Sequence, residues 1–440
     1  MINRILQLFL VLSVGIVLFF GVTPKIIGLG IRDATVTSLI NLVPPESQGQ
    51  VRITESQFDN GWFSSTATID IGLVALGMDD SLTAKLDLEI EHGPFFLTDE
   101  GPRMGLARAR IIPGFNSQEL TQALTEIPFE IPSVDISMFV PFDQSLTVDL
   151  DVAPVNYNQD DGVVTFAGMN GNLSVNADQS AQLSISVGNM FAQDNESQIG
   201  FTLAGIEVES HTAQMNDLLA PSSVLLAIPA ISATGPFAFN VTDMSSNARM
   251  QASTIPQAID IYQDLRIGNI ESDLPVQSLS WTAEFNEIQN ELFRSYYELI
   301  GTIQSQMNTN PSAVMTTADQ FGEDMALLFI QNSLVLNNLV QANVYGGDHS
   351  IDFRIDWEGL PDLTDLENPE FEELANALAI LIEMSFDERA IMSSQFAEMV
   401  DPYVQEGYFV VENGRIMLSA SLENGVLSVN GEEVPIDQFF

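Results

Sequence analysis

Residues 82–91 read LTAKLDLEIE, in which apolar side chains at every second position alternate with polar or charged ones. A period of two is that of a β-strand, whose successive side chains point to opposite faces of a sheet. The same alternation recurs at 146–152 and 181–187, within a region that extends from Val51 to about Leu274. This region therefore predicts long antiparallel strands with one apolar and one solvated face.

Asn-Gly and Asp-Gly pairs separate many of these stretches, as expected of tight hairpins, because Asn and Gly readily adopt positive φ. Three such pairs lie in the first half of the chain, namely Asn60-Gly61, Asp161-Gly162 and Asn170-Gly171. Three more separate short strands near the C-terminus, namely Asn413-Gly414, Asn424-Gly425 and Asn430-Gly431. Each pair predicts a hairpin turn.

The apolar period changes from two to about 3.6 near Trp281, which predicts an amphipathic helix. Its apolar stripe consists of Phe285, Ile288, Leu292, Tyr296, Leu299 and Ile303. We expect this stripe to pack within its own domain, with a dimer seam as the alternative. A second helix is expected between Pro311 and Asn332, and residues 351–357 alternate again as a strand. A third helix is expected from Pro369, with one face formed by Phe371, Leu374, Leu378, Leu381 and Ile382.

Residues 5–22 form an uncharged apolar stretch between Arg4 and Lys25. As a helix it would be about 27 Å long, just enough to span the hydrocarbon core of a bilayer. A cleaved signal peptide would have a shorter apolar region and small residues before the cleavage site. We therefore expect an uncleaved signal anchor rather than a cleaved signal or a buried core helix. With no second apolar span, the remainder of the chain lies on one side, which we expect to be the periplasm of a bacterium.

The predicted fold class is α+β and β-rich, behind a single N-terminal transmembrane helix. Long antiparallel strands come first, and a C-terminal part mixes amphipathic helices with hairpins. The expected organisation is an anchor (1–24), a juxtamembrane segment (25–50), a β-rich periplasmic domain (51–275) and an α+β periplasmic domain (276–440). The juxtamembrane segment is either an interfacial helix or a first helix packed on the domain.

The chain of 440 residues contains 60 acidic and 14 basic side chains, giving a formal net charge of −46. Such a chain is repelled by phosphate backbones and has few cations with which to release counterions, which argues against nucleic-acid binding. Hydrophobic residues make up 45% of the chain, enough for a large core rather than an acidic disordered tail. The charge is interpreted as a solvated surface suited to saline surroundings, with recruitment of a cationic partner as the alternative.

No catalytic, cofactor-binding or metal-binding constellation was found. The chain has no cysteine, and its three histidines, His92, His211 and His349, are more than a hundred residues apart. No nucleophile elbow, phosphate-binding loop or zinc-protease motif occurs. Residues 156–162 resemble the start of a calcium loop, but position twelve is Ala167, so a hairpin turn is expected there instead. We expect a protein that is not an enzyme and needs no cofactor.

Short motifs at both ends of the chain resemble a known family. Gly61, Trp62, Phe63, Ser64 and Ser65 open a strand, and Glu91, His92, Gly93, Pro94 and Phe95 follow about thirty residues later. The C-terminus contains Gly407-Tyr408-Phe409 and then GVLSVNG, ending in Asn430-Gly431. Together these motifs resemble the YdgA-like family of bacterial envelope proteins, a domain family without an established biochemical function. The resemblance implies an inner-membrane anchor and a periplasmic body, and it carries over no catalytic residue.

The motif residues themselves are interpreted as structural. Trp62 and Phe63 are expected to anchor a strand, Gly93-Pro94 to end one, and His92 to be a hydrogen-bonding strand-end residue. For function, we expect an inner-membrane-anchored periplasmic protein that binds or handles a lipid or other apolar ligand along an amphipathic sheet. The alternative is a structural or interaction protein of the envelope, in the form of a homo-oligomer. A carboxylate-dependent hydrolase is a remote third hypothesis.

Overall fold

The computed structural model describes residues 51–60, 64–73, 82–98, 101–115, 132–273, 275–297, 326–361 and 371–434. It divides into two compact units: of the described residues, those up to Ser222 and residues 296–297 belong to the first, and those in 223–295 and 326–434 belong to the second. The predicted anchor, residues 5–22, and the juxtamembrane segment lie outside the described residues. Within the described residues, no helix combines the length and the apolar character needed to cross a membrane.

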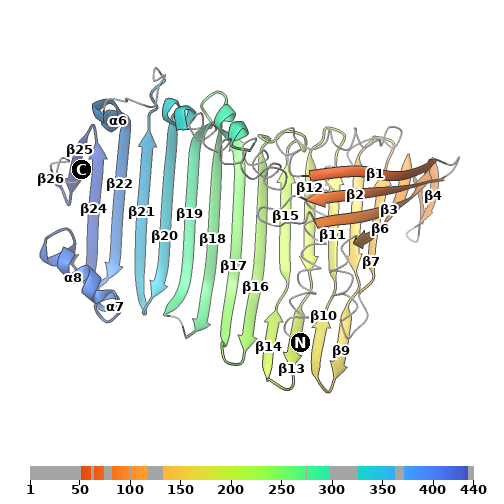
Figure 1. The fold of residues 1–440 in the computed structure, drawn as a ribbon, viewed down its shortest axis with the longest axis horizontal. Coiled ribbons are helices and arrows are strands. Elements are labelled where there is room, and N and C mark those ends of the chain that lie inside the picture. Colours follow the sequence, from red (N-terminus) through yellow and green to blue (C-terminus); the bar gives the residue numbers. More distant parts are fainter. Residues whose placement is uncertain are drawn as a thin grey trace, which may run out of the picture. The chain divides into compact units, whose positions relative to one another are not determined.

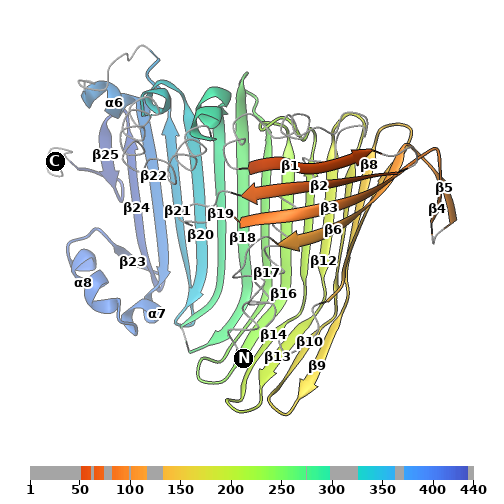
Figure 2. The same cartoon turned by 45° about the vertical axis from the view of Figure 1, so that its right-hand side comes forward.

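The first unit consists of antiparallel strands, which Figures 1 and 2 show in orange to yellow-green. They are β1 (Val51–Asn60), β2 (Ser64–Leu73), β3 (Leu82–His92), β4 (Phe95–Thr98), β5 (Gly101–Met104), β6 (Ala107–Phe115), β7 (Val134–Val140), β8 (Leu146–Val152), β9 (Val155–Gln159), β10 (Gly162–Phe166), β11 (Met169–Val175), β12 (Ala181–Val187), β13 (Met190–Asp194), β14 (Ile199–Leu203) and β15 (Ile206–Thr212). The predicted long antiparallel strands are confirmed.

The apolar side chains in the core of the first unit are buried. In Figures 1 and 2, β1–β3 and β6 run across later strands of the same unit, such as β11 and β12. Both sets of strands contribute buried apolar side chains, among them Ile69 of β2, Ile90 of β3, Val148 of β8 and Leu173 of β11. Val148 is 0% exposed and Leu173 is 1% exposed, so the apolar faces of these strands have been removed from water.

Of two turns predicted in this unit, one is present in the structure and the other is not. At Asp161-Gly162 the structure has a hairpin between β9 and β10, with Asp160 and Asp161 as its loop. The turn predicted at Asn170-Gly171 is wrong, because both residues lie inside β11 and pair with β8 and β12. The chain bends just before this point, at Gly168, whose φ of 96° is left-handed. Asn170-Gly171 lies within a ladder that is paired on both sides, so its local turn preference is overridden.

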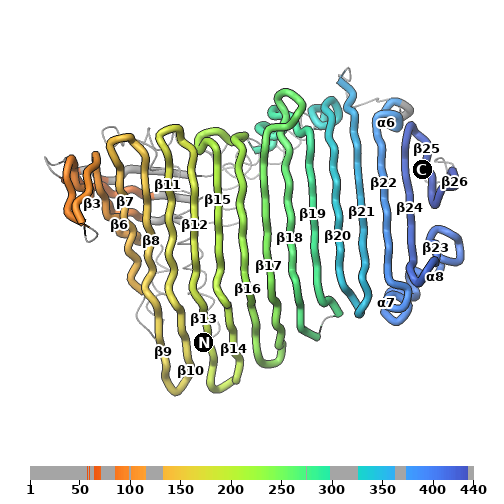
Figure 3. Tube along the Cα trace, turned by 180° about the vertical axis from the view of Figure 1, so that it is seen from behind, coloured from red at the N-terminus to blue at the C-terminus, as the bar shows by residue number. Residues whose placement is uncertain are grey.

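The second unit is a run of long antiparallel strands, shown side by side in Figure 3. They are β16 (Ser222–Thr234), β17 (Phe239–Ala252), β18 (Ala258–Ser272), β19 (Val276–Gln289), β20 (Leu334–Val344), β21 (Gly347–Trp357), β22 (Leu378–Asp387), β23 (Val410–Glu412), β24 (Arg415–Glu423), β25 (Val426–Val429) and β26 (Glu432–Val434). The helices are α6 (Phe371–Ala377), α7 (Glu388–Met392) and α8 (Ala397–Gln405). Residues 290–297 and 326–331 are also helical. Figure 1 shows that α6, α7 and α8 lie at the ends of these strands.

The helix predicted over Phe285 and Ile288 is wrong, because both residues belong to β19 and the helical stretch begins only at residue 290. Their spacing of three has a local cause. Ile259 pairs with Ile288 and Ile261 pairs with Phe285, so β19 contains one extra residue at a β-bulge. Glu287 in this bulge has φ 67°, and its backbone N–H donates to Asp260 Oδ1 at 3.0 Å. Phe285 and Ile288 therefore do not belong to the helical stripe that was the alternative dimer seam. Leu299 and Ile303 of that stripe lie outside the described residues.

The helix predicted from Pro369 is confirmed only as far as Ala377, where α6 ends and β22 begins. Leu378, Leu381 and Ile382 are therefore strand residues, which corrects the prediction. They pair with β21 on one side, and β22 pairs with β24 on the other, so long-range partners decide the conformation. The strand predicted at 351–357 is confirmed as β21.

All three C-terminal hairpin turns are confirmed. Asn413-Gly414, Asn424-Gly425 and Asn430-Gly431 are the two-residue loops that connect β23–β24, β24–β25 and β25–β26. Every residue of these loops has positive φ, between 50° and 84°. Positive φ at both positions defines the type I′ turn, for which Asn-Gly is the preferred sequence.

Candidate functional site

One group of motif residues meets where β2 begins and β3 ends. Ser65 is 3% exposed, and its hydroxyl lies 2.9 Å from Nε2 of His92. Ser64, one residue earlier, is exposed and pairs with Glu91. Gly61, Trp62 and Phe63 lie outside the described residues. The described motif residues thus form a cross-strand contact that joins the two motifs.

Gly93 and Pro94 lead from this contact into the β4–β5 hairpin. The Gly93 N–H donates to the Leu106 carbonyl at 2.8 Å, and the Gly105 N–H donates to the Pro94 carbonyl at 3.2 Å. A Cβ atom at Gly93 would lie only 1.9 Å from the Gly105 carbonyl oxygen, so no other residue fits here without movement of the backbone. These residues hold the base of the hairpin, and Phe96 in the hairpin packs edge-to-face on Phe139 of β7 at 5.9 Å.

A second group of motif residues lies at the end of the second unit. The Asn430 amide group donates to the Tyr408 carbonyl at 2.9 Å and to the Gly407 carbonyl at 3.3 Å. Its Oδ1 accepts the Ser419 N–H at 3.0 Å. Gly431 completes the β25–β26 turn beside it. Asn430 therefore ties the Gly407-Tyr408-Phe409 motif to β24.

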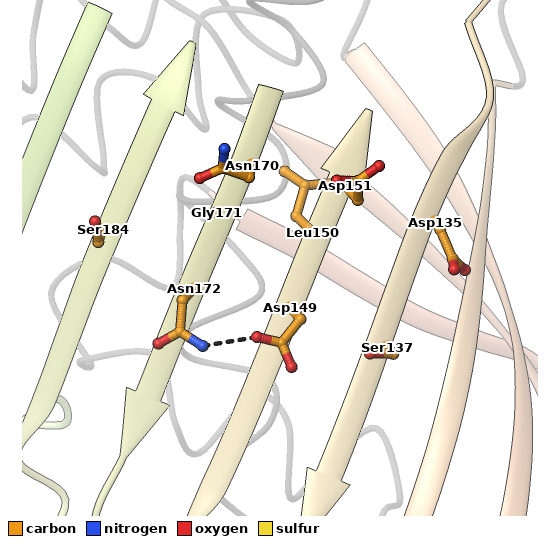
Figure 4. Close-up of a pocket in the computed structure, with 9 residues that line it drawn as sticks. All are labelled: Asp135, Ser137, Asp149, Leu150, Asp151, Asn170, Gly171, Asn172 and Ser184. Carbon is orange, nitrogen blue, oxygen red and sulfur yellow. Dashed lines mark hydrogen bonds between the residues drawn. The ribbon is translucent and has the colours of Figure 1, made fainter. Parts of the chain in front are cut away.

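A polar pocket of about 330 Å³ lies on the solvated side of the first unit (Figure 4). The residues that line it are Asp135, Ser137, Asp149, Leu150, Asp151, Asn170, Gly171, Asn172 and Ser184. Two of its carboxylates have partners, because Asn172 donates to Asp149 at 2.7 Å and Arg110 pairs with Asp135 at 3.2 Å. Among the described residues, no group of three or more His, Asp or Glu side chains could hold a metal ion. We interpret the pocket as a solvated strand face.

A larger polar pocket, of about 670 Å³, lies in the second unit on strands β18 to β21 and β24. Arg415 at its edge is already bound, because Nε donates to Ser385 Oγ at 2.9 Å and Nη1 to the Asp348 carbonyl at 2.6 Å. His349 Nε2 lies 3.0 Å from the Val344 carbonyl. These contacts join the edges of neighbouring strands.

Among the described residues, four carboxyl groups have a lowered pKa, and each is at a turn or on a strand surface. At Asp143 and Asp178 the main cause is a hydrogen bond from the hydroxyl of the serine two residues later, Ser145 or Ser180, at 2.7 Å. Backbone N–H groups of Ser197 and Glu196 lower the pKa of Asp194. Thr68 and then Lys85 lower that of Asp87. These hydrogen bonds favour the charged form and stabilise the turns.

The most extensive chemical feature of the second unit is one apolar face of its sheet. Directly paired residues project to the same face, so the strand registers define rows of side chains that cross the strands. The first row is Ile261, Phe285, Leu336, Ile355, Ile380 and Leu422. The second row is Leu265, Trp281, Val340, Ile351, Met384 and Leu418. Every residue of both rows is only half-buried, which contrasts with the sealed core of the first unit.

We call these two rows the apolar face of the second unit. Asn338, which lies between the rows, accepts a hydrogen bond from the Trp281 indole N–H at 3.0 Å, so its side chain is satisfied there. The opposite side of the sheet carries polar and charged residues, for example Asp352, Arg354 and Asp356 of β21. Sequence reasoning identified the alternation of β21 but missed the rows, because they depend on the pairing register of six strands.

Comparison with known proteins identifies a family but no relative of known structure or function. The family model described as "Bacterial protein of unknown function (DUF945)" matches residues 6–437. Neither the curated proteins nor the solved structures include a match to the chain. The matched region covers both structural units and all the motif residues named above. The chain therefore belongs to this bacterial family of unknown function.

Proposed function

We propose that the protein is an envelope protein that binds lipid acyl chains on the apolar face of its second unit. The observation that carries this proposal is the pair of continuous, half-buried rows from Ile261 to Leu422 and from Leu265 to Leu418. Apolar areas that stay in partial contact with water mark binding sites more often than ordinary surface does. The family membership is consistent with a bacterial protein of this kind and specifies no activity.

The dimensions of the apolar face suit an acyl chain. Each row crosses six strands, which at about 4.8 Å between neighbours gives a length of roughly 24 Å. The rows are four residues apart along each strand, for example from Ile351 to Ile355, or about 13 Å. One leaflet of a bilayer has a hydrocarbon depth of about 15 Å, half of the usual core thickness. A lipid chain can therefore lie along a row with its whole length against apolar side chains.

The location in the cell is part of the same proposal. Residues 5–22 would anchor the chain in the inner membrane, and the two units would lie in the periplasm, where lipids must cross an aqueous space. A sheet with one apolar and one charged side offers lipid chains a single surface, because the Asp352–Asp356 side stays solvated. The chain would act as a binding protein and not as an enzyme.

Photocrosslinking in intact membranes tests the apolar face directly. Benzophenone-alanine would replace Phe353, which lies between the two rows, or Tyr262, which points to the opposite side of the sheet from Ile261. We expect adducts of lipid mass on the purified full chain from Phe353 and none from Tyr262. Equal labelling at both positions, or no lipid adduct at Phe353, would overturn the proposal.

A matched pair of variants then tests the role of the rows. Ile351→Asn places an amide on the apolar face, whereas Asp352→Asn places the same group on the solvated face of the same strand. Burying an amide against hydrocarbon costs about 1–3 kcal/mol, so Ile351→Asn should weaken the binding of NBD-labelled palmitate by roughly tenfold or more. Asp352→Asn should leave it unchanged, and equal affinities of the two variants would contradict acyl-chain binding here.

A further inference from the structure

Helices α7 and α8 lie at the opposite end of the second unit's strands from α6 (Figure 1), and the segment that contains them is rich in exposed methionine and aromatic side chains. Of 21 exposed large apolar residues in the described chain, seven fall between residues 392 and 411. We call them the aromatic–methionine patch: Met392, Phe396, Met399, Tyr403, Tyr408, Val410 and Val411. Met399 is 65% exposed and Tyr403 is 52% exposed. This concentration is unlike the scattered single apolar residues of an ordinary surface.

Aromatic contacts and backbone hydrogen bonds attach the patch to the sheet of the second unit. Helix α8 has no buried residue, yet Tyr403 packs edge-to-face on Phe409 at 6.2 Å and on Tyr408 at 6.4 Å. Phe409 in turn contacts Phe386 of β22 at 6.3 Å. Asn430 holds the backbone of Tyr408 and Gly407 through its side-chain amide. The C-terminal family motifs therefore fix the position of an exposed apolar surface.

Within residues 390–414 every charged side chain is negative. Glu398, Asp401, Glu406 and Glu412 are exposed, and the sequence from 390 to 414 contains no lysine or arginine. Arg389 and Arg415 flank this stretch, and Arg415 is bound to Ser385 and Asp348. The Gln405 side-chain amide donates to Asp401 Oδ2 at 2.8 Å. An apolar centre with an acidic rim is complementary to a partner with an apolar stripe and basic flanks.

We propose that the aromatic–methionine patch is a docking site for a cationic amphipathic segment of another protein. Methionine and aromatic residues are the side chains that adapt to and dominate protein interfaces. A second copy of this chain would bring the same carboxylates together, and like charges across an interface oppose association. Anionic lipid headgroups would be repelled for the same reason. This docking site is separate from the apolar face and does not depend on the proposed lipid function.

A peptide titration tests the proposal. The probe is a fluorescent amphipathic helix of leucine and lysine, with a scrambled peptide of equal composition as its control. The full chain in nanodiscs of neutral lipid is titrated against each peptide, and empty nanodiscs measure background. We expect the amphipathic peptide to bind at least tenfold more tightly than the scrambled one, because only the former presents an apolar stripe.

Variants locate the binding on the chain. Met399→Ser with Tyr403→Ser should weaken the amphipathic peptide tenfold or more, as expected for interface hot spots. Leu225→Ser with Val426→Ser, at residues 41% and 48% exposed in the same unit, should have no effect. Glu398→Gln with Glu406→Gln should weaken binding several-fold at low salt, whereas Glu432→Gln with Glu433→Gln should not. All eight positions are at least 36% exposed, so each variant is expected to fold.

Three outcomes would overturn the proposal. The first is equal affinity of the amphipathic and scrambled peptides, which indicates attraction to the net charge alone. The second is unchanged binding by Met399→Ser with Tyr403→Ser. The third is a dimer of the full chain, or its attachment to anionic vesicles, that this same double variant abolishes, since either result assigns the patch to a second copy or to a bilayer.

Discussion

Replacement of Asn430 by glycine should loosen the C-terminal end of the second unit far more than the same change at Asn424. Both residues occupy the first position of an Asn-Gly type I′ turn, with φ of 51° and 50°. Glycine adopts this φ without strain, so neither change disturbs the turn geometry. Only Asn430 has side-chain hydrogen bonds, to Ser419, Tyr408 and Gly407. The comparison therefore isolates those bonds from the turn itself.

The expected size of the effect follows from their geometry. The bonds at 2.9 and 3.0 Å are of normal length, and the one at 3.3 Å to Gly407 is long. At about 1 kcal/mol for each normal bond, Asn430→Gly should destabilise this region by about 2 kcal/mol. An alanine substitution would add roughly 1–2 kcal/mol at either site, because alanine disfavours positive φ. The corresponding estimate for Asn424→Gly is close to zero.

Hydrogen exchange followed by mass spectrometry is the appropriate assay, because it reports local opening in a chain of two units. A loss of about 2 kcal/mol corresponds to roughly 30-fold faster exchange. We expect this acceleration in peptides that cover 407–434 of Asn430→Gly, and little change for Asn424→Gly. If both variants exchange at the same rate, the Asn430 side chain does not stabilise this region and the reasoning is refuted.

Two further predictions concern the first unit. Gly93→Ala should destabilise it by about 3 kcal/mol, because the added Cβ would lie 1.9 Å from the Gly105 carbonyl oxygen. Thermal unfolding measures this loss. The control is Gly114→Ala, whose Cβ would lie 3.6 Å from the nearest atom. Asp143 and Asp178 have a lowered pKa in the folded state, so their contribution to stability is present above their ordinary value of 3.8 and is lost as the pH falls through the folded pKa. Asn at both positions should therefore flatten the acid limb of the stability curve, and an unchanged limb would contradict this assignment.

The strand regions were predictable because their apolar period is a local signal. LTAKLDLEIE at 82–91 lies in β3, and the alternating residues 351–357 lie in β21. The three C-terminal turns were predictable for a similar reason, since type I′ geometry demands residues that tolerate positive φ. By contrast, the turns at Asp143 and Asp178 were missed. In these turns Gln144 and Gln179 take positive φ, and the aspartate–serine hydrogen bonds compensate for a residue type that does not signal a turn.

The errors arose where long-range pairing or an irregularity changed the period. The bulge at Glu287 moves Phe285 and Ile288 to a spacing of three while both still face the same side of the sheet. A spacing of three is also that of a helix, and sequence alone does not distinguish the two. At Leu378 the sequence continues a helical stripe from Leu374, but Leu378, Ile380 and Ile382 also alternate with a period of two. The strands β21 and β24 on either side select the second pattern.

The sequence predicted strands with one apolar face, but not which of these faces stay partly exposed. Alternation describes Ile69 of β2 and Ile355 of β21 in the same way, yet the first is 6% exposed and the second is half-buried. The difference arises because β2 crosses other strands of its unit, a matter of topology rather than of local sequence. Leaving apolar area in water forgoes about 25 cal/mol for each square ångström that could have been buried. Complete burial of the twelve half-buried apolar residues in the two rows would therefore have made the folded state more stable. A ligand that covers these residues would gain the same free energy on binding. The same reasoning predicts that lipid binding raises the unfolding temperature of the second unit, and that Ile351→Asn removes most of that rise while Asp352→Asn retains it.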